Sequence, residues 1–123
     1  MRLAVYIPSE SEGIDIPEEI RQPIIDGVKR DFSTRYGGYT SHDAVGGWMN
    51  DEGELIEELV TVVYTFTQYP DVQSLETMGR RVAKLLYQDC VAIEVGYEMR
   101  FMEPEQTEYA AYDTPSDSPI GMS

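Results

Sequence analysis

Apolar and polar residues alternate over three segments of the chain, and a period of two is typical of a β-strand. In residues 2–8, Leu3, Val5 and Ile7 fall on one side. Residues 54–67 alternate as well but carry apolar side chains on both faces, as a central strand does. Residues 91–101 alternate from end to end, and predict a single last strand with one core face.

Two other segments repeat their apolar residues every three or four positions, which is the period of an amphipathic helix. The first covers residues 20–32 and is followed by Gly37, the residue expected to end the helix in a left-handed conformation. The second covers residues 72–86 and begins directly after the strand-breaking sequence 69–71.

Pro23 lies inside the first helical pattern, so the start of this helix can be interpreted in two ways. Proline has no N–H to donate and clashes with the preceding turn. Either the helix kinks at Pro23, with Asp15 as its N-cap, or residues 16–21 form a separate turn. The second arrangement costs less, so we expect the main helix to start near Gln22.

Residues 39–67 predict a hairpin, with a turn at residues 50–53 and a bulge at Gly46-Gly47. The resulting order of strands and helices predicts an α+β fold, namely a ferredoxin-like βαββαβ sandwich. It would be a four-stranded antiparallel sheet with two helices on one face. Residues 1–102 would form a single α+β domain. Residues 103–123, which contain no basic side chain, would form a flexible acidic tail.

The uncovered face of this sheet would be small and charged. By alternation, it is expected to carry several residues of the first, third and last strands: Ala4, Tyr6, Ala92, Glu94, Gly96 and Glu98, with Thr61, Val63 and Thr65 as further candidates. Such a face favours dimerisation or binding.

The chain has 23 acidic residues against nine Lys and Arg, and its net charge is −14. Only Lys29 and Lys84 are lysines. In molar salt the Debye length falls to about 3 Å, so the carboxylates would be screened from one another. The composition is therefore typical of a salt-adapted protein. The alternative is a carboxylate surface that mimics nucleic acid. Direct nucleic-acid binding is not expected, because the sequence has no extended basic patch.

The N-terminal apolar run ends at Pro8 and is too short to span a membrane. A single cysteine, Cys90, rules out a disulfide within the chain. We therefore expect a cytoplasmic protein, in the host cytoplasm if it is viral, without membrane contact and without a cofactor.

His42-Asp43 is the candidate pair for proton transfer, but adjacent strand residues point to opposite faces. The acidic turn near residues 51–58 lacks the spacing of a calcium loop. Trp48 is a candidate for an aromatic platform with Tyr39 and Tyr64. The candidate interaction residues are Tyr39, His42, Trp48, Glu57, Glu58, Glu94 and Glu98.

Three short motifs between residues 32 and 58 carry a resemblance: Phe-Ser-Thr-Arg-Tyr-Gly-Gly-Tyr-Thr at 32–40, Val-Gly-Gly-Trp at 45–48 and Gly-Glu-Leu-Ile-Glu-Glu at 53–58. Together they resemble a pattern of small uncharacterised α+β proteins of phages, haloviruses and some microbes. The resemblance covers about a quarter of the chain. It implies a similar small domain and no established activity, so it assigns no catalytic residue.

From these features we expect a small non-enzymatic protein of a halophilic archaeon or its virus. It would act through protein contacts, as a homodimer joined through the open sheet face or an edge strand, or with a host protein. One alternative is an acidic DNA mimic that inhibits a host nucleic-acid-binding protein. A second is a small enzyme that uses His42 with a carboxylate such as Glu94.

Overall fold

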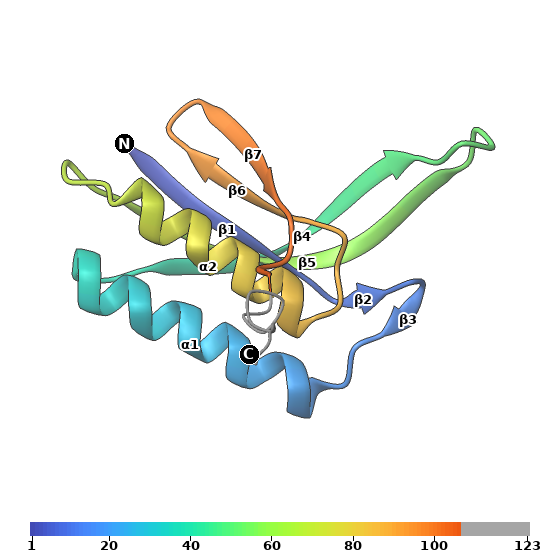
Figure 1. The fold of residues 1–123 in the computed structure, drawn as a ribbon, viewed down its shortest axis with the longest axis horizontal. Helices are drawn as coiled ribbons and strands as arrows, with labels where there is room; N and C mark the ends of the chain where they lie inside the picture. Colours follow the sequence, from blue (N-terminus) through green and yellow to red (C-terminus); the bar gives the residue numbers. More distant parts are fainter. Residues whose placement is uncertain (107–123) are drawn as a thin grey trace, which may run out of the picture.

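Two helices pack against one face of a five-stranded antiparallel sheet in the computed structural model, which describes residues 1–106 (Figure 1). The helices are α1 (Glu18–Tyr36) and α2 (Val72–Leu85). In their order across the sheet, the strands are β4 (Thr40–Met49), β5 (Leu55–Phe66), β1 (Arg2–Pro8), β6 (Val91–Val95) and β7 (Glu98–Met102). A separate short hairpin joins β2 (Glu10–Ser11) to β3 (Ile14–Asp15).

The α+β class, the antiparallel pairing and the two helices on one face are confirmed, but the four-stranded ferredoxin-like βαββαβ order is not matched. The difference arises in residues 91–101. Gly96 adopts a φ of +65°, which favours glycine, and the chain turns back there to form β7. Tyr97 in this turn is fully exposed and Phe101 is 64% exposed. These two residues therefore do not extend the core face, as a single last strand would require.

Helix α1 starts directly after Pro17 and continues through Pro23, so the expected separate turn is wrong. Pro23 removes one hydrogen bond, to the carbonyl of Glu19, and that residue lies in the exposed first turn where water can replace the donor. Asp15 belongs to β3 and is not the N-cap. Gly37 ends the helix as predicted, with a φ of 90° and its N–H donating to the Ser33 carbonyl.

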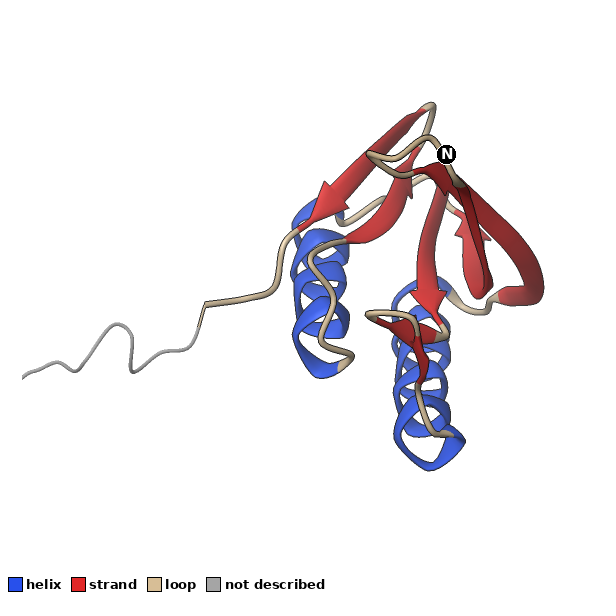
Figure 2. Ribbon diagram, turned by 90° about the vertical axis from the view of Figure 1, so that its right-hand side faces the viewer, coloured by secondary structure: helices blue, strands red, loops and turns tan. Residues whose placement is uncertain are grey.

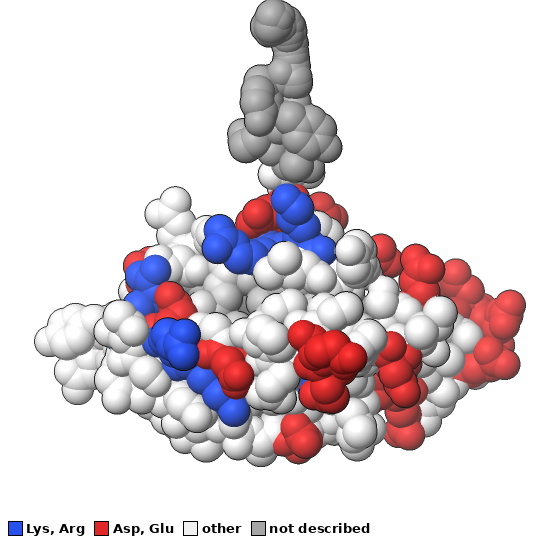
Figure 3. Space-filling view, turned by 90° about the horizontal axis from the view of Figure 1, so that it is seen from below, with Lys and Arg blue, Asp and Glu red and all other residues white. Residues whose placement is uncertain are grey.

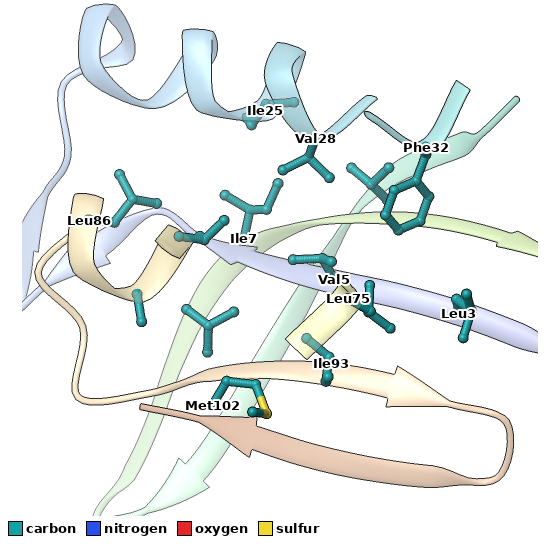
Figure 4. Packing of buried hydrophobic residues seen from close by; sticks show 14 of the residues in the cluster. Leu3, Val5, Ile7, Ile25, Val28, Phe32, Leu75, Leu86, Ile93 and Met102 are labelled. Atoms are coloured by element: carbon teal, nitrogen blue, oxygen red, sulfur yellow. The ribbon is translucent and has the colours of Figure 1, made fainter. Parts of the chain in front are cut away.

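The core lies between the two helices and the covered face of the sheet, where the labelled side chains point toward one another (Figure 4). Its largest fully buried members include Phe32, Leu3 and Ile7. Burial of each such side chain contributes about 1.5–3 kcal/mol. Gly79 brings α2 close to the sheet, because a Cβ at that position would lie 3.0 Å from side-chain atoms of Ile93 and Met102.

Asp71 caps the N-terminus of α2 and ties it to α1. Its carboxylate accepts hydrogen bonds from the Ser74 hydroxyl at 2.7 Å and the Ser74 N–H at 3.1 Å. Nη1 of Arg35, on α1, lies 3.3 Å from Oδ2 of Asp71. The hydrogen bonds from Ser74, and to a lesser degree the charge of Arg35, lower the pKa of Asp71. The charged form of Asp71 is therefore favoured in the folded state.

We predict that Asp71→Asn removes part of the acid sensitivity of the fold. Because folding lowers the pKa of Asp71, its contribution is complete above the ordinary value of about 4 and is lost as the pH falls through the lowered value. Asparagine caps helices well but does not titrate. Below about pH 4, the melting temperature of the wild type should therefore fall more steeply than that of Asp71→Asn.

The measurement is thermal unfolding followed by circular dichroism across the acid range. Asp51→Asn is the matched control, since Asp51 lies in the turn between β4 and β5 and caps no helix. A constant difference in melting temperature between wild type and Asp71→Asn at every pH would contradict the prediction.

Candidate functional site

The sheet face turned away from the helices has its own buried residues (Figure 2). Ala4 is fully buried and Val62 is 1% exposed, although neither belongs to the core under the helices. Both are covered by side chains of the open face itself. Long polar and aromatic side chains of the open face therefore pack over Ala4 and Val62.

Four side chains surround Ala4 and form the Glu94 cluster, which consists of Glu94, Tyr6, Arg2 and Tyr64. Glu94 and Tyr64 are the register partners of Ala4 on β6 and β5. Arg2 and Tyr6 lie two residues before and after it on β1. Because side chains two residues apart share a face of a strand, the alternation in residues 2–6 places all four groups together.

Hydrogen bonds hold the Glu94 cluster together. The Tyr6 hydroxyl donates to Glu94 Oε1 at 2.6 Å, and Arg2 Nε donates to both carboxylate oxygens at 3.2 Å. The Arg2 guanidinium also lies over the Tyr64 ring, 3.9 Å from its centroid. The side chains of Arg2 and Glu94 remain 28% and 22% exposed. The carboxylate is thus fixed in position yet reachable from solvent.

The cluster alters the acidity of two of its members. Burial raises the pKa of Tyr6, and the hydrogen bond to the Glu94 carboxylate raises it further. Burial alone would lower the pKa of Arg2, but the hydrogen bond and charge of Glu94 outweigh it and raise that pKa. Tyr6 therefore stays a hydrogen-bond donor and Arg2 stays a cation at physiological pH.

An aromatic row extends the cluster along β5 and onto β4. The Tyr64 ring meets the rings of His42 and Phe66 edge to face, with centroids 6.0 Å and 5.9 Å apart. Phe66 is 67% exposed. Aromatic faces attract cations and stack on planar rings, and a carboxylate attracts a cation. The chemistry of this surface therefore suits a ligand with a positive charge and a planar group.

The candidate residues from the sequence divide between the two sheet faces. By register, His42, Trp48, Glu58 and Glu94 lie on the open face, whereas Glu57 and Glu98 lie on the other face, and Tyr39 precedes β4 beside Lys29. The expected open-face positions are confirmed for Ala4, Tyr6, Ala92 and Glu94, but Thr61, Val63, Thr65 and Glu98 lie on the covered side.

Several predicted partners are far apart. His42 and Glu94 share a face, but β5 and β1 lie between their strands, a separation of about 14 Å. Trp48 pairs with Ile56 and Tyr64 with Thr40, so eight residues of β5, or about 26 Å, separate the two aromatic side chains of the expected platform. Glu58 instead accepts hydrogen bonds from the N–H groups of Ser9 and Glu10.

The β4–β5 hairpin projects beyond the helices (Figure 1). Its register runs without interruption through Gly46-Gly47, so the expected bulge is wrong. Several large apolar side chains in the projecting part are more than half exposed: Val45, Trp48, Met49, Leu55 and Leu59. A dimer joined through the open face or an edge strand stays a prediction.

Within residues 1–106, no three His, Cys, Asp or Glu side chains converge as a metal site would need. No helix in that part of the chain is both long and apolar enough to cross a membrane. The expected flexible tail, apart from residues 103–106, lies outside the described residues, and the cytoplasmic location stays a prediction.

The fold is similar to the folds of two solved structures. The structure resembles a phage SAM lyase in complex with S-methyl-5′-thioadenosine, with a TM-score of 0.59 and 11% identity over 88% of this chain and 90% of that chain. It also resembles a phage SAM lyase in the apo state, with a TM-score of 0.54 and 12% identity over 87% and 91% of the two chains.

No protein-family model and no curated protein matches the sequence. The resemblance to uncharacterised phage and halovirus proteins therefore stays untested, and so does the salt-adapted source. At 11–12% identity, the likeness to the lyase structures establishes the fold alone.

The solved structures nevertheless contradict the expectation of a non-enzymatic protein that acts through protein contacts. The two chains that share this fold over most of their length are enzymes. The alternative of an acidic DNA mimic that inhibits a host nucleic-acid-binding protein is also non-enzymatic and is not retained. The expectation of a non-enzymatic protein is therefore withdrawn.

Sequence reasoning placed Tyr6 and Glu94 on the open face, but it gave Tyr6 no chemical role and paired Glu94 with His42 instead of with Tyr6 and Arg2. It did not single out Arg2, although Arg2 alternates in phase with Ala4 and Tyr6. The usable signal was the alternation that puts Arg2 and Tyr6 on one face of β1 and Glu94 on one face of β6, two strands that pair in the structure. A cation, a phenol and a carboxylate at that spacing can form a hydrogen-bonded cluster.

Proposed function

We propose that the protein is an enzyme that breaks down S-adenosylmethionine and releases S-methyl-5′-thioadenosine, with the Glu94 cluster as its reaction site. The observation that carries this proposal is a reachable carboxylate, held by Tyr6 and Arg2, beside an exposed aromatic row. The fold shared with the phage lyases supports it.

The substrate matches this surface in charge and shape. S-adenosylmethionine carries a positive sulfonium, a positive ammonium and a planar adenine. Glu94 is the negative group of the cluster, and Tyr64 and Phe66 offer ring faces for a cation or for stacking. Arg2 is the cation that would attract the substrate carboxylate, because a guanidinium binds a carboxylate through two N–H groups.

The reaction requires no water. The bond between sulfur and the terminal carbon of the four-carbon chain breaks, and sulfur keeps the electron pair to become a neutral thioether. The four-carbon fragment then becomes a stable product by one of two routes. Its own carboxylate attacks that carbon and closes a lactone, or a base removes a proton from the adjacent carbon and leaves an alkene. Glu94 orients the cationic substrate in the first route and is the candidate base in the second.

The proposal predicts that the purified protein converts S-adenosylmethionine to S-methyl-5′-thioadenosine in the absence of any second substrate. The measurement is chromatography of the nucleoside product with mass detection. The four-carbon products of the two routes have the same mass, so proton NMR identifies them, since only the alkene has vinyl protons. Binding of S-methyl-5′-thioadenosine alone is measured by calorimetry.

A rate no higher than that of the heat-denatured sample, together with no heat of nucleoside binding, would overturn the proposal. Release of methionine and adenosine instead would also contradict it, because a different bond to sulfur would have been cleaved.

A further inference from the structure

A groove of about 490 Å³ runs between α1 and α2, on the side of the molecule opposite the Glu94 cluster. This volume lies within the range of ligand-binding pockets in proteins. Its apolar surface comes from both helices, and its lining includes Ile24, Val28, Met78, Val82 and Leu85. Leu85 is 47% exposed, so apolar surface is left uncovered among the described residues.

The α1 wall of the groove carries few side-chain atoms around Gly27. Gly27 lines it, and a Cβ at this position would meet no atom within 4 Å. Pro23 lies one turn earlier on the same wall and has no backbone N–H. Glycine also costs about 1 kcal/mol in a helix relative to alanine. The groove therefore has room for an occupant that approaches the α1 backbone closely.

The described chain ends at the α2 rim of this groove. The Glu105 N–H donates to the Arg80 carbonyl at 3.2 Å. The Glu105 carboxylate lies 3.7 Å from Arg81 and 3.9 Å from Lys84, and Arg81 itself lines the groove. In Figure 3, which shows the helix side, Lys and Arg residues gather where the described chain ends. The chain leaves this point within reach of the groove.

The sequence that follows is suited to that surface. Residues 109–112 read Tyr-Ala-Ala-Tyr, flanked by Glu108 and Asp113. The groove offers apolar side chains for the two tyrosine rings, and Arg35 and Arg81 for the flanking carboxylates. Five residues reach at most about 17 Å, which is sufficient to cross between two neighbouring helices.

We propose that residues 107–113 bind in the groove between α1 and α2 of their own chain. The tyrosines cover the apolar floor, and the acidic flanks pair with the arginines of the rim. Binding within the chain is favoured over binding to a second copy because Glu105 fixes the start of the segment beside the groove. The short connection gives the segment a high effective concentration there.

Disulfide trapping tests this proposal in the full-length protein. In a Cys90→Ser background, Gly27→Cys is combined with Ala111→Cys, and both are small changes. The control pair combines Gln22→Cys with Ala111→Cys, since Gln22 lies on a different, exposed face near the same end of α1. Under mild oxidation, the disulfide between positions 27 and 111 should form within one chain at least about tenfold faster than that of the control.

Equal rates for the two pairs, or a disulfide that forms between two chains, would overturn the proposal. A second variant avoids introduced cysteines. Gly27→Leu places an apolar side chain in the groove and a better helix former in α1, and its Cβ would meet no described atom within 4 Å, so the fold should be kept. Chymotrypsin should then cleave after Tyr109 or Tyr112 at least about five times faster than in the wild type. An unchanged cleavage rate would contradict the proposal.

Discussion

Glu94→Gln is expected to lower the rate of S-adenosylmethionine breakdown at least about a hundredfold. Glutamine keeps the size of the side chain and can still accept hydrogen bonds from Tyr6 and Arg2, but it is neutral. It can neither attract a cationic substrate nor take up a proton. At an effective dielectric constant of about 20, a charge pair 4 Å apart is worth about 4 kcal/mol, which exceeds the energy of a hundredfold change.

Glu98→Gln is the matched control for this variant. Glu98 belongs to the same β6–β7 hairpin, but its register places it on the covered side of the sheet, where it pairs with Arg100. It should keep activity within about twofold of the wild type, because exposed ion pairs contribute little. The two variants should melt at similar temperatures. Equal activity of Glu94→Gln and Glu98→Gln would locate the reaction away from the cluster.

Secondary structure could be predicted where the apolar period was long and unbroken. Helix α2 follows the three- and four-residue period from Val72 onward, and its cap at Asp71 is visible in the sequence. The strand β1 alternates, and β5 has apolar side chains on both faces, as expected of a strand inside the sheet. The last strand misled because alternation continues through Gly96 and Tyr97, and periodicity alone does not distinguish one long strand from a hairpin with an in-phase turn.

The candidate site was harder to predict because it depends on pairing between distant strands. Glu94 and Arg2 meet only when β6 pairs with β1 in the observed register, and a shift by one residue would move Glu94 to the covered face. His42-Asp43 drew attention because its residues are adjacent in sequence. In the structure their side chains separate, with His42 beside Tyr64 and Asp43 accepting a hydrogen bond from Thr61.

Arg21→Met is expected to destabilise the fold by about 3 kcal/mol. Arg21 is only 8% exposed, and its guanidinium donates to the carbonyls of Ile7 and Pro8 and to the Thr61 hydroxyl. These bonds tie α1 to the end of β1 and to β5. Methionine preserves much of the packing volume but has no donor, so buried acceptors would lose their partners.

The comparison that isolates this effect is Arg30→Met on the exposed side of the same helix, which should change the free energy of unfolding by less than about 0.5 kcal/mol. Arg21→Lys should fall between the two, because an ammonium on a flexible stem cannot reproduce the planar fork that reaches three acceptors. Urea unfolding of the three variants gives the free energies. A loss for Arg21→Met no larger than for Arg30→Met would mean that water replaces the guanidinium at these carbonyls. Apolar packing alone would then hold α1 against the sheet.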